Sequence, residues 1–196
     1  MAKKKTAVKK SVKKKSAKKA VIKKSAKKAV VKAGVKVLKP SIMPVAGDSA
    51  PDFSLPASTG HAINLASFRN NQNVVLYFYP KDDTPGCTME ACSFRDHHGR
   101  ILATGTAVIG VSPDAIKSHL RFIEKYNLPF PLVADEQNTV ATKYGVWVEK
   151  SMYGRTYMGI QRATFLIDKT GKIAAAWPKV KVDGHTDEVL AAIQKL

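Results

Sequence analysis

The chain has 196 residues and a net charge of +18, from 33 lysine and arginine side chains against 15 aspartates and glutamates. Residues 1–40 carry 17 lysines and no acidic residue, so the other 156 residues, with 16 basic and 15 acidic side chains, are nearly neutral. No run approaches the roughly 18 apolar residues of a membrane-spanning helix, and the basic start lacks the unbroken apolar stretch of a secretory signal, which excludes both classes.

These numbers predict a tail (1–40), a linker (41–50) and one domain (46–196) large enough to bury its own core. The tail repeats lysine clusters separated by alanine, valine and serine, so it can bury little surface and its charges repel each other. We therefore expect it to be disordered in free solution.

The phosphates of DNA or RNA are the partner that best fits the tail. The tail has no aromatic side chain and no arginine, so we predict electrostatic binding without sequence preference. A solubility arm, an anionic membrane surface and a nuclear-import signal are the alternatives. The lysines assigned to nucleic acid are Lys3, Lys4, Lys5, Lys9, Lys10, Lys13, Lys14, Lys15, Lys18, Lys19, Lys23, Lys24, Lys27 and Lys28.

Strands alternate with helices in the domain, and a hairpin and a helix follow. In chain order, the predicted elements are a hairpin (52–55 and 61–65), a buried central strand (73–79), a loop (80–86), a helix (87–100), a buried strand (106–111), a helix (112–126), a strand (132–134), a helix (137–144), a hairpin (163–168 and 172–177) and a helix (186–195). This order predicts an α/β fold with three layers, α/β/α, around a central mixed sheet. It is compatible with the thioredoxin fold, and alternation alone also allows a flavodoxin-like sheet.

Cys87 is the residue with the clearest chemical setting. It follows a buried strand and a loop, and it opens a predicted helix. A thiol at a helix N-terminus faces unpaired N–H groups and the positive end of the helix dipole, which favour the thiolate. Thr84 lies three residues upstream, where its hydroxyl can bond to the sulfur or to a bound oxygen, and Pro80 and Pro85 stiffen the loop. An isolated cysteine is more often a small buried apolar residue, but here the loop-to-helix placement and a second cysteine coincide.

The spacing of Cys87 and Cys92 indicates how the two thiols can react. Five residues along a regular helix place their Cα atoms roughly 8.6 Å apart, whereas a disulfide needs about 4.4–6.8 Å. The pair can bridge only if the first helical turns unwind. We expect no metal site, because two cysteines would need two more ligands and the neighbouring His97 and His98 are expected to be solvated.

The segment from Tyr77 to Asp96 contains the pattern Pro80-x-x-x-Thr84-x-x-Cys87 with Cys92 five residues on. It resembles the active site of peroxiredoxins, in particular the peroxiredoxin Q/bacterioferritin comigratory subfamily. The strings at 128–132 and 159–168 also match, so the resemblance covers about residues 46–195. It implies a thioredoxin-like fold, reduction of hydrogen peroxide and alkyl hydroperoxides, thioredoxin as the reductant, no bound cofactor and a monomer.

The resemblance also implies the roles of site residues. Cys87 would attack the peroxide and become a sulfenic acid, and Cys92 would resolve it as a disulfide. Thr84 would hydrogen-bond the peroxide, and Pro80 would shield the sulfenate. Arg162 would hold the thiolate, which fits the unusual position of an arginine beside a buried strand. Glu90 matches a recurrent acid of the subfamily, and a helix-dipole partner is an equal explanation for it.

Two other functions remain open from the sequence. A thioredoxin-like disulfide oxidoreductase would need Cys-x-x-Cys, which is absent. A nucleic-acid-binding, histone-like protein with an incidental enzyme body would keep its DNA phenotype without Cys87. We expect a cytoplasmic protein, associated with the nucleoid if the tail binds DNA, or a nuclear one in a eukaryote. His61, His119 and His185 are expected to be structural, and Tyr153 and Tyr157 to lie in a loop that lines the site.

Overall fold

The computed structural model describes residues 42–152 and 154–196. The predicted disordered, nucleic-acid-binding tail (1–40) lies outside the described residues, as do Ser41 and Tyr153. Among the described residues, no helix combines the length and the hydropathy that a bilayer span requires.

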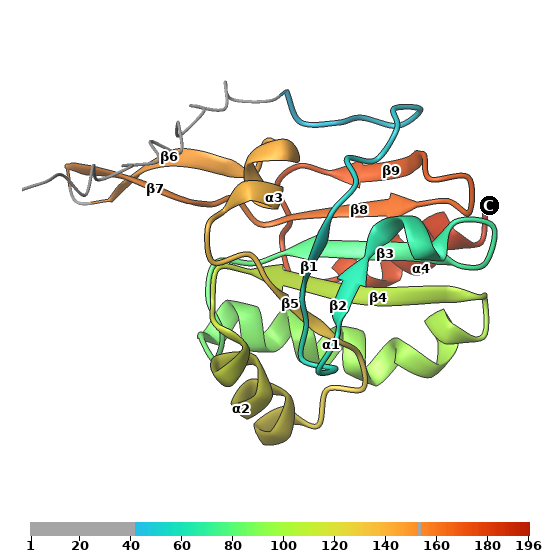
Figure 1. Cartoon of the computed structure of the whole chain (residues 1–196), viewed down its shortest axis with the longest axis horizontal. Helices are drawn as coiled ribbons and strands as arrows, with labels where there is room; N and C mark the ends of the chain where they lie inside the picture. The colour runs from blue at the N-terminus through green and yellow to red at the C-terminus, as the bar shows by residue number, and fades with distance from the viewer. Residues whose placement is uncertain (1–41, 153) are drawn as a thin grey trace, which may run out of the picture. The chain divides into compact units, whose positions relative to one another are not determined.

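A five-stranded sheet in the order β5-β4-β3-β8-β9 forms the centre of the domain (Figure 1). Its strands are β3 (Asn73–Phe78), β4 (Thr106–Ser112), β5 (Leu132–Ala134), β8 (Ala163–Ile167) and β9 (Ile173–Trp177). Strand β3 runs parallel to β4 and antiparallel to β8, so the predicted mixed sheet is confirmed. Every residue of β3 is buried, as its continuous apolar run predicts for a strand with both faces covered.

Helices α1 (Pro85–Leu102), α2 (Ile116–Tyr126) and α4 (His185–Ile193) pack on one face of the sheet. The other face is covered by α3 (Thr139–Lys143), the 3-10 helix η1 (Leu65–Phe68) and the hairpin of β1 (Ser54–Pro56) and β2 (Ala62–Asn64). Neighbouring residues of β3 point to opposite faces, so Tyr77 packs on the side of α1, α2 and α4, and Phe78 packs on the side of α3 and η1. The predicted three-layer plan is confirmed.

All four α-helices begin one to four residues away from their predicted starts, and the shifts of α1 and α2 have a clear cause. Helix α1 begins at Pro85 with Thr84 as its N-cap, so Pro85 takes the first helical position and Cys87 is the third residue. Helix α2 begins at Ile116 and not at the Ser112-Pro113-Asp114 segment. The reason is that the Asp114 carboxylate accepts hydrogen bonds from Ser112 Oγ and from a backbone N–H of the β3–α1 loop, which holds this segment as a connection.

The prediction that Tyr157 lies in a loop is wrong. Strands β6 (Trp147–Met152) and β7 (Arg155–Ile160) form an antiparallel hairpin that extends away from the central sheet (Figure 1). Tyr157 lies on β7 and is exposed, and Tyr153 lies outside the described residues. Most of β7 is exposed, so the hairpin lacks the alternation of apolar and polar residues that marks a half-buried strand.

The segment 47–58, which we call the edge strap, connects the two edges of the sheet. At one edge, Gly47 N donates to Ile173 O (2.8 Å) and Ile173 N donates to Asp48 O (2.8 Å). At the other edge, Ser58 N donates to Leu132 O (2.9 Å), next to a bridge between Ala57 and Val133. The predicted linker (41–50) and the predicted domain (46–196) overlap at residues 46–50, and residues 47–50 hydrogen-bond to the turn before β9 and to its first residue, where an edge strand offers open backbone groups.

Candidate active site

The β3–α1 loop brings Cys87 from the centre of the sheet to the start of α1. After β3, Tyr79 N still donates to Val111 O (3.1 Å), which extends the sheet pairing to the edge of the loop. Asp83 then adopts a left-handed conformation (φ +55°) that turns the chain into the helix, a conformation that aspartate tolerates better than most residues. Thr84 is extended, and the helix follows from Pro85.

Cys87 is almost completely buried, with 1% of its surface exposed. As the third residue of α1 it lies within the first turn, where backbone N–H groups have no helical acceptor. Arg162 Nη2 lies 3.3 Å from Cys87 Sγ and donates a hydrogen bond to it. A Cβ atom on Gly86 would lie 3.3 Å from the same nitrogen, so the absence of a side chain there lets the guanidinium approach the sulfur.

Arg162 and Glu90 form a buried ion pair beside the thiol. Arg162 follows β7 and uses one nitrogen for Cys87 and the other, Nη1, for Glu90 Oε2. Burial raises the pKa of Glu90 to about 7, although the charge of Arg162 acts in the opposite direction. Burial also disfavours the charged guanidinium, but Glu90 and Cys87 outweigh this and raise the pKa of Arg162 above its ordinary value. The arginine thus remains a cation next to the sulfur.

Lys150 is a second cation near the thiol that the sequence did not reveal. It lies on β6 and donates from Nζ to Ile160 O (2.5 Å), across the hairpin and just before Arg162. Burial and the neighbouring Arg162 lower the pKa of Lys150, while Cys87 raises it. Lys150 reaches the site through the β6–β7 hairpin, which the sequence analysis did not predict.

Cys92 lies in the same unbroken helix as Cys87 and is half-buried. Both thiols are free. The continuous helix keeps the Cα atoms at the helical spacing of roughly 8.6 Å, which is too far for a disulfide. The intact helix therefore holds the two free thiols too far apart to form the predicted disulfide.

Comparison with known proteins identifies the family. The AhpC/TSA family model matches residues 46–176. The putative peroxiredoxin Bcp of Coxiella burnetii is 52% identical over 147 residues, which cover 75% of this chain and 97% of the relative. Peroxiredoxin Bcp of Escherichia coli is 47% identical over 145 residues, which cover 74% of this chain and 92% of the relative. The chain belongs to the peroxiredoxins of the Bcp/PrxQ type.

Solved structures support the same family and fold. Peroxiredoxin Q of Xanthomonas campestris has a TM-score of 0.71 and 38% identity, with 80% of this chain and 98% of that chain covered. A PrxQ mutant of Xylella fastidiosa has a TM-score of 0.73 and 38% identity, with 79% and 98% covered. The predicted thioredoxin-like fold is confirmed, and so is the enzyme class, a peroxidase among the oxidoreductases.

The peroxiredoxin loop places Thr84 and Pro80 near the start of α1, and both are half-buried. Thr84 Oγ1 donates to Lys81 O (3.0 Å) and not to the sulfur. Because its proton is used by this backbone carbonyl, the oxygen has lone pairs left to accept a hydrogen bond. The roles of Thr84 and Pro80 toward a peroxide stay predictions.

Among the histidines of this peroxiredoxin, His97 and His98 are less solvated than the sequence suggested, whereas His119 and His185 are buried, in agreement with the expected structural role. His97 and His98 are half-buried: His97 Nδ1 bonds to Ser93 O (2.9 Å), and burial lowers the pKa of His98. His119 and His185, for which the sequence named no partner, contact Asp82 and Thr164 through hydrogen bonds. No group of three or more possible metal ligands occurs in residues 42–152 and 154–196.

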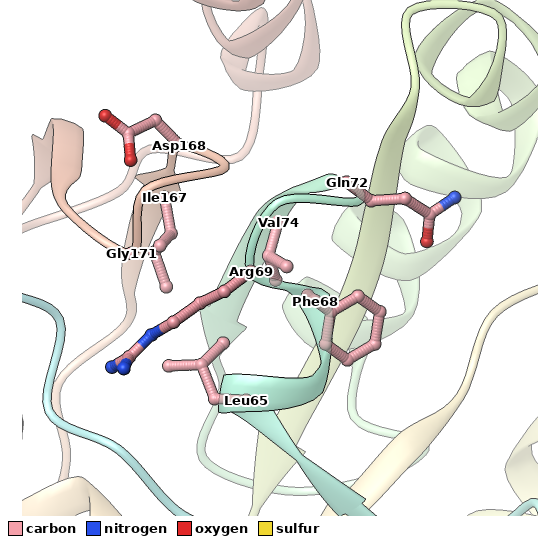
Figure 2. Close-up of a pocket in the computed structure, with 8 residues that line it drawn as sticks. All are labelled: Leu65, Phe68, Arg69, Gln72, Val74, Ile167, Asp168 and Gly171. Atoms are coloured by element: carbon pink, nitrogen blue, oxygen red, sulfur yellow. The ribbon is translucent and has the colours of Figure 1, made fainter.

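A small hollow lies at the opposite end of β3 from the thiol. Figure 2 shows its lining, from Leu65 and Phe68 of η1 to Ile167 and the turn at Gly171. Its volume is about 10 Å³, which is roughly the space that one water molecule needs. Neither Cys87 nor Arg162 lines it, so this hollow is no part of the peroxiredoxin's reaction site.

Proposed function

We propose that Cys87 is the thiolate that reduces hydrogen peroxide and alkyl hydroperoxides. The single observation that carries this assignment is the hydrogen bond of 3.3 Å from the Arg162 guanidinium to Cys87 Sγ at the start of α1. A cation and unpaired N–H groups at one sulfur stabilise the anion that must attack. The structures of Xanthomonas campestris bacterioferritin comigratory protein include trapped intermediate/ligand complexes that concern its alkyl peroxide reduction activity.

The chemical step forms a bond between Cys87 Sγ and one peroxide oxygen while the O–O bond breaks. The second oxygen leaves as water or an alcohol after taking up a proton, and Cys87 becomes a sulfenic acid. Negative charge moves from sulfur to the leaving oxygen, so Arg162 would stabilise both ends of the reaction path. Thr84 Oγ1 would accept a hydrogen bond from the peroxide, and Pro80 would restrict the access of water. Glu90 would hold the guanidinium in place through Nη1.

Resolution would follow through Cys92. Its thiolate attacks the sulfenic sulfur of Cys87, a disulfide forms, and the sulfenic oxygen leaves as water after protonation. The helical spacing requires the first turns of α1 to unwind before this step. A dithiol protein of the thioredoxin type would return two electrons and restore both thiols.

Peroxide turnover with a thioredoxin system tests this cycle in wild type, Cys87→Ser and Cys92→Ser. The Cys87 variant should lose all turnover. The Cys92 variant should consume one equivalent of peroxide and then stop, because its sulfenic acid has no partner. Peroxide turnover by Cys87→Ser would contradict the assignment. Reduction of protein disulfides by the wild type in the absence of peroxide would instead favour a thioredoxin-like disulfide oxidoreductase.

We further propose that the tail holds the peroxidase on DNA or RNA. The observation in favour is the charge division, with 17 lysines and no acid in residues 1–40. The full chain and a 41–196 truncation are compared in a gel-shift assay with random-sequence duplex. Only the full chain should bind, and its log affinity should fall with log salt concentration by about 0.9 for each phosphate contacted. Equal binding by both proteins, or binding that salt does not weaken, would contradict this function of the tail.

A further inference from the structure

The β3–α1 loop holds a buried carboxylate that the peroxidase reaction does not use. Asp82 is 6% exposed. Two side chains lie within hydrogen-bond distance of its carboxylate, one just after β3 and one on α2. Tyr79 Oη donates to Asp82 Oδ1 (2.7 Å), and His119 Nδ1 lies 2.9 Å from Asp82 Oδ2. A carboxylate can only accept, so this histidine nitrogen carries the proton. His119 is completely buried on α2.

The neighbouring residues fasten the same loop to the same side of the domain. Asp82 N donates to Asp114 Oδ2 (2.8 Å), which connects the loop to the end of β4. Asp83 accepts from Lys125 Nζ at both oxygens (2.9 and 2.7 Å) and from Tyr126 Oη (2.6 Å), both on α2. These contacts hold Asp83 in its left-handed conformation, which sets the direction in which α1 starts.

Further along α1, a second set of contacts begins directly after Cys92. Ser93 Oγ bonds to Thr186 Oγ1 of α4 (2.7 Å), and Arg95 Nη1 donates to Tyr126 O (2.8 Å). Between the two sets lie residues 84–92. In the described part of the chain, all side-chain hydrogen bonds and ion pairs from 84–92 to other elements go to Arg162.

We propose that Asp82 and His119 anchor the catalytic loop while residues 84–92 unwind, and that His119 is a positioning residue that sets the balance between peroxide reduction and disulfide formation. The proposal rests on the Cys87–Cys92 cycle proposed above. Both partners lie outside the segment that must unwind, so their contact survives when Cys87 leaves Arg162. The loop then keeps the geometry from which the first turn reforms.

The direction of the effect follows from chain entropy. With the anchor, release is limited to the nine residues 84–92; without it, the loop before Thr84 is held only by Asp82 N and by Asp83, so loosening of this loop can add to the freedom of the unwound form and favour it. His119→Leu also leaves the buried carboxylate without one of its two side-chain donors, which penalises the folded loop again. His119→Asn keeps an N–H donor near the same position and should rescue the loop.

A rapid-quench experiment on the full chain measures this balance. After a hydrogen peroxide pulse, alkylation and mass spectrometry follow Cys87 as thiol, sulfenic acid, disulfide and sulfinic acid. For His119→Leu we expect oxidation of Cys87 to slow by about tenfold and disulfide formation to speed up by about tenfold. Less sulfinic acid should form at high peroxide, because the sulfenic acid leaves the folded site sooner. His119→Asn should lie close to wild type.

The matched control is Val189→Ala, a cavity variant in the core of α4. It should lower the melting temperature without moving the two rates in opposite directions. If His119→Leu does not fold, the milder variant Tyr79→Phe tests the anchor, because it also removes one donor to Asp82. It should slow the oxidation of Cys87 and speed up disulfide formation, as predicted for His119→Leu. Rates that stay at wild-type values, change together or match those of Val189→Ala would overturn the anchor. Wild-type protein that forms no disulfide would overturn the cycle itself, and the anchor with it.

Discussion

Glu90 is a carboxylate that the fold buries beside the reactive thiol, and its titration predicts a pH dependence of helix unwinding. Burial raises its pKa from the ordinary 4.5 to about 7. At about 1.4 kcal/mol for each unit of pKa, this rise corresponds to about 3 kcal/mol. Because the pKa of Glu90 is raised in the folded helix, Glu90 contributes stability to the helix fully below pH 4.5, and this contribution is lost as the pH rises through 7.

When residues 84–92 unwind, Glu90 reaches water, and the free-energy cost of burying its negative charge disappears. Unwinding should therefore become easier between pH 5 and pH 8, by up to about 100-fold in the population of the unwound form. Glu90→Gln stays neutral and can still accept a hydrogen bond from Arg162, so its helix should not loosen with pH.

The assay follows disulfide formation after a peroxide pulse in wild type and Glu90→Gln from pH 5 to pH 8. Ionisation of Cys92 affects both proteins equally, so the quotient of the two rates isolates the effect of Glu90. We expect this quotient to rise with pH and to level off above pH 8. A quotient that is constant over this range would refute the reasoning, and one that falls would show that Glu90 stabilises the helix as an anion.

Four further substitutions test the site and the packing beneath it. In Arg162→Lys, a single ammonium group replaces the guanidinium that donates to both Cys87 and Glu90. Oxidation of Cys87, followed by stopped flow, should therefore slow by about 100-fold. An unchanged rate would mean that a positive charge alone is sufficient. Gly86→Ala should slow the same step while leaving the melting temperature equal or higher, because the new methyl group pushes the guanidinium and not the core. Tyr77→Phe should stabilise the protein to urea by about 1 kcal/mol, since its buried hydroxyl has no partner among the described residues. Gly110→Ala should cost about 1–3 kcal/mol, because its Cβ would lie 2.7 Å from that hydroxyl, and Tyr77→Phe in the same chain should recover part of the loss.

The central strand and the thiols could be predicted because their signals are local. The apolar run before Pro80 indicates a strand with both faces buried, and the five-residue step from Cys87 to Cys92 gives their separation in any regular helix. Arg162 was singled out by the resemblance to peroxiredoxins, with support from its unusual position beside a buried strand, and its guanidinium donates a hydrogen bond to the sulfur.

The missed parts depend on contacts between distant residues. Asp82 and Asp83 read as ordinary loop residues, and their partners on α2 lie 37 to 43 positions away in the sequence. Lys150 reaches the site only because β6 and β7 pair with each other in a largely exposed hairpin, which no periodic pattern announces. Pairing of residues 47–50 with β9 likewise depends on the backbone groups of an edge strand, which side-chain composition does not reveal.

The edge strap also has a consequence for self-association. Open outer strands of a sheet can recruit a strand from another molecule, which is a common start of fibrous aggregates. Here one short stretch of the chain occupies pairing positions at the start of β9 and along β5. If α1 unwinds in each catalytic round, as proposed above, these pairings should keep both edges of the sheet closed to strand exchange while the helix is open.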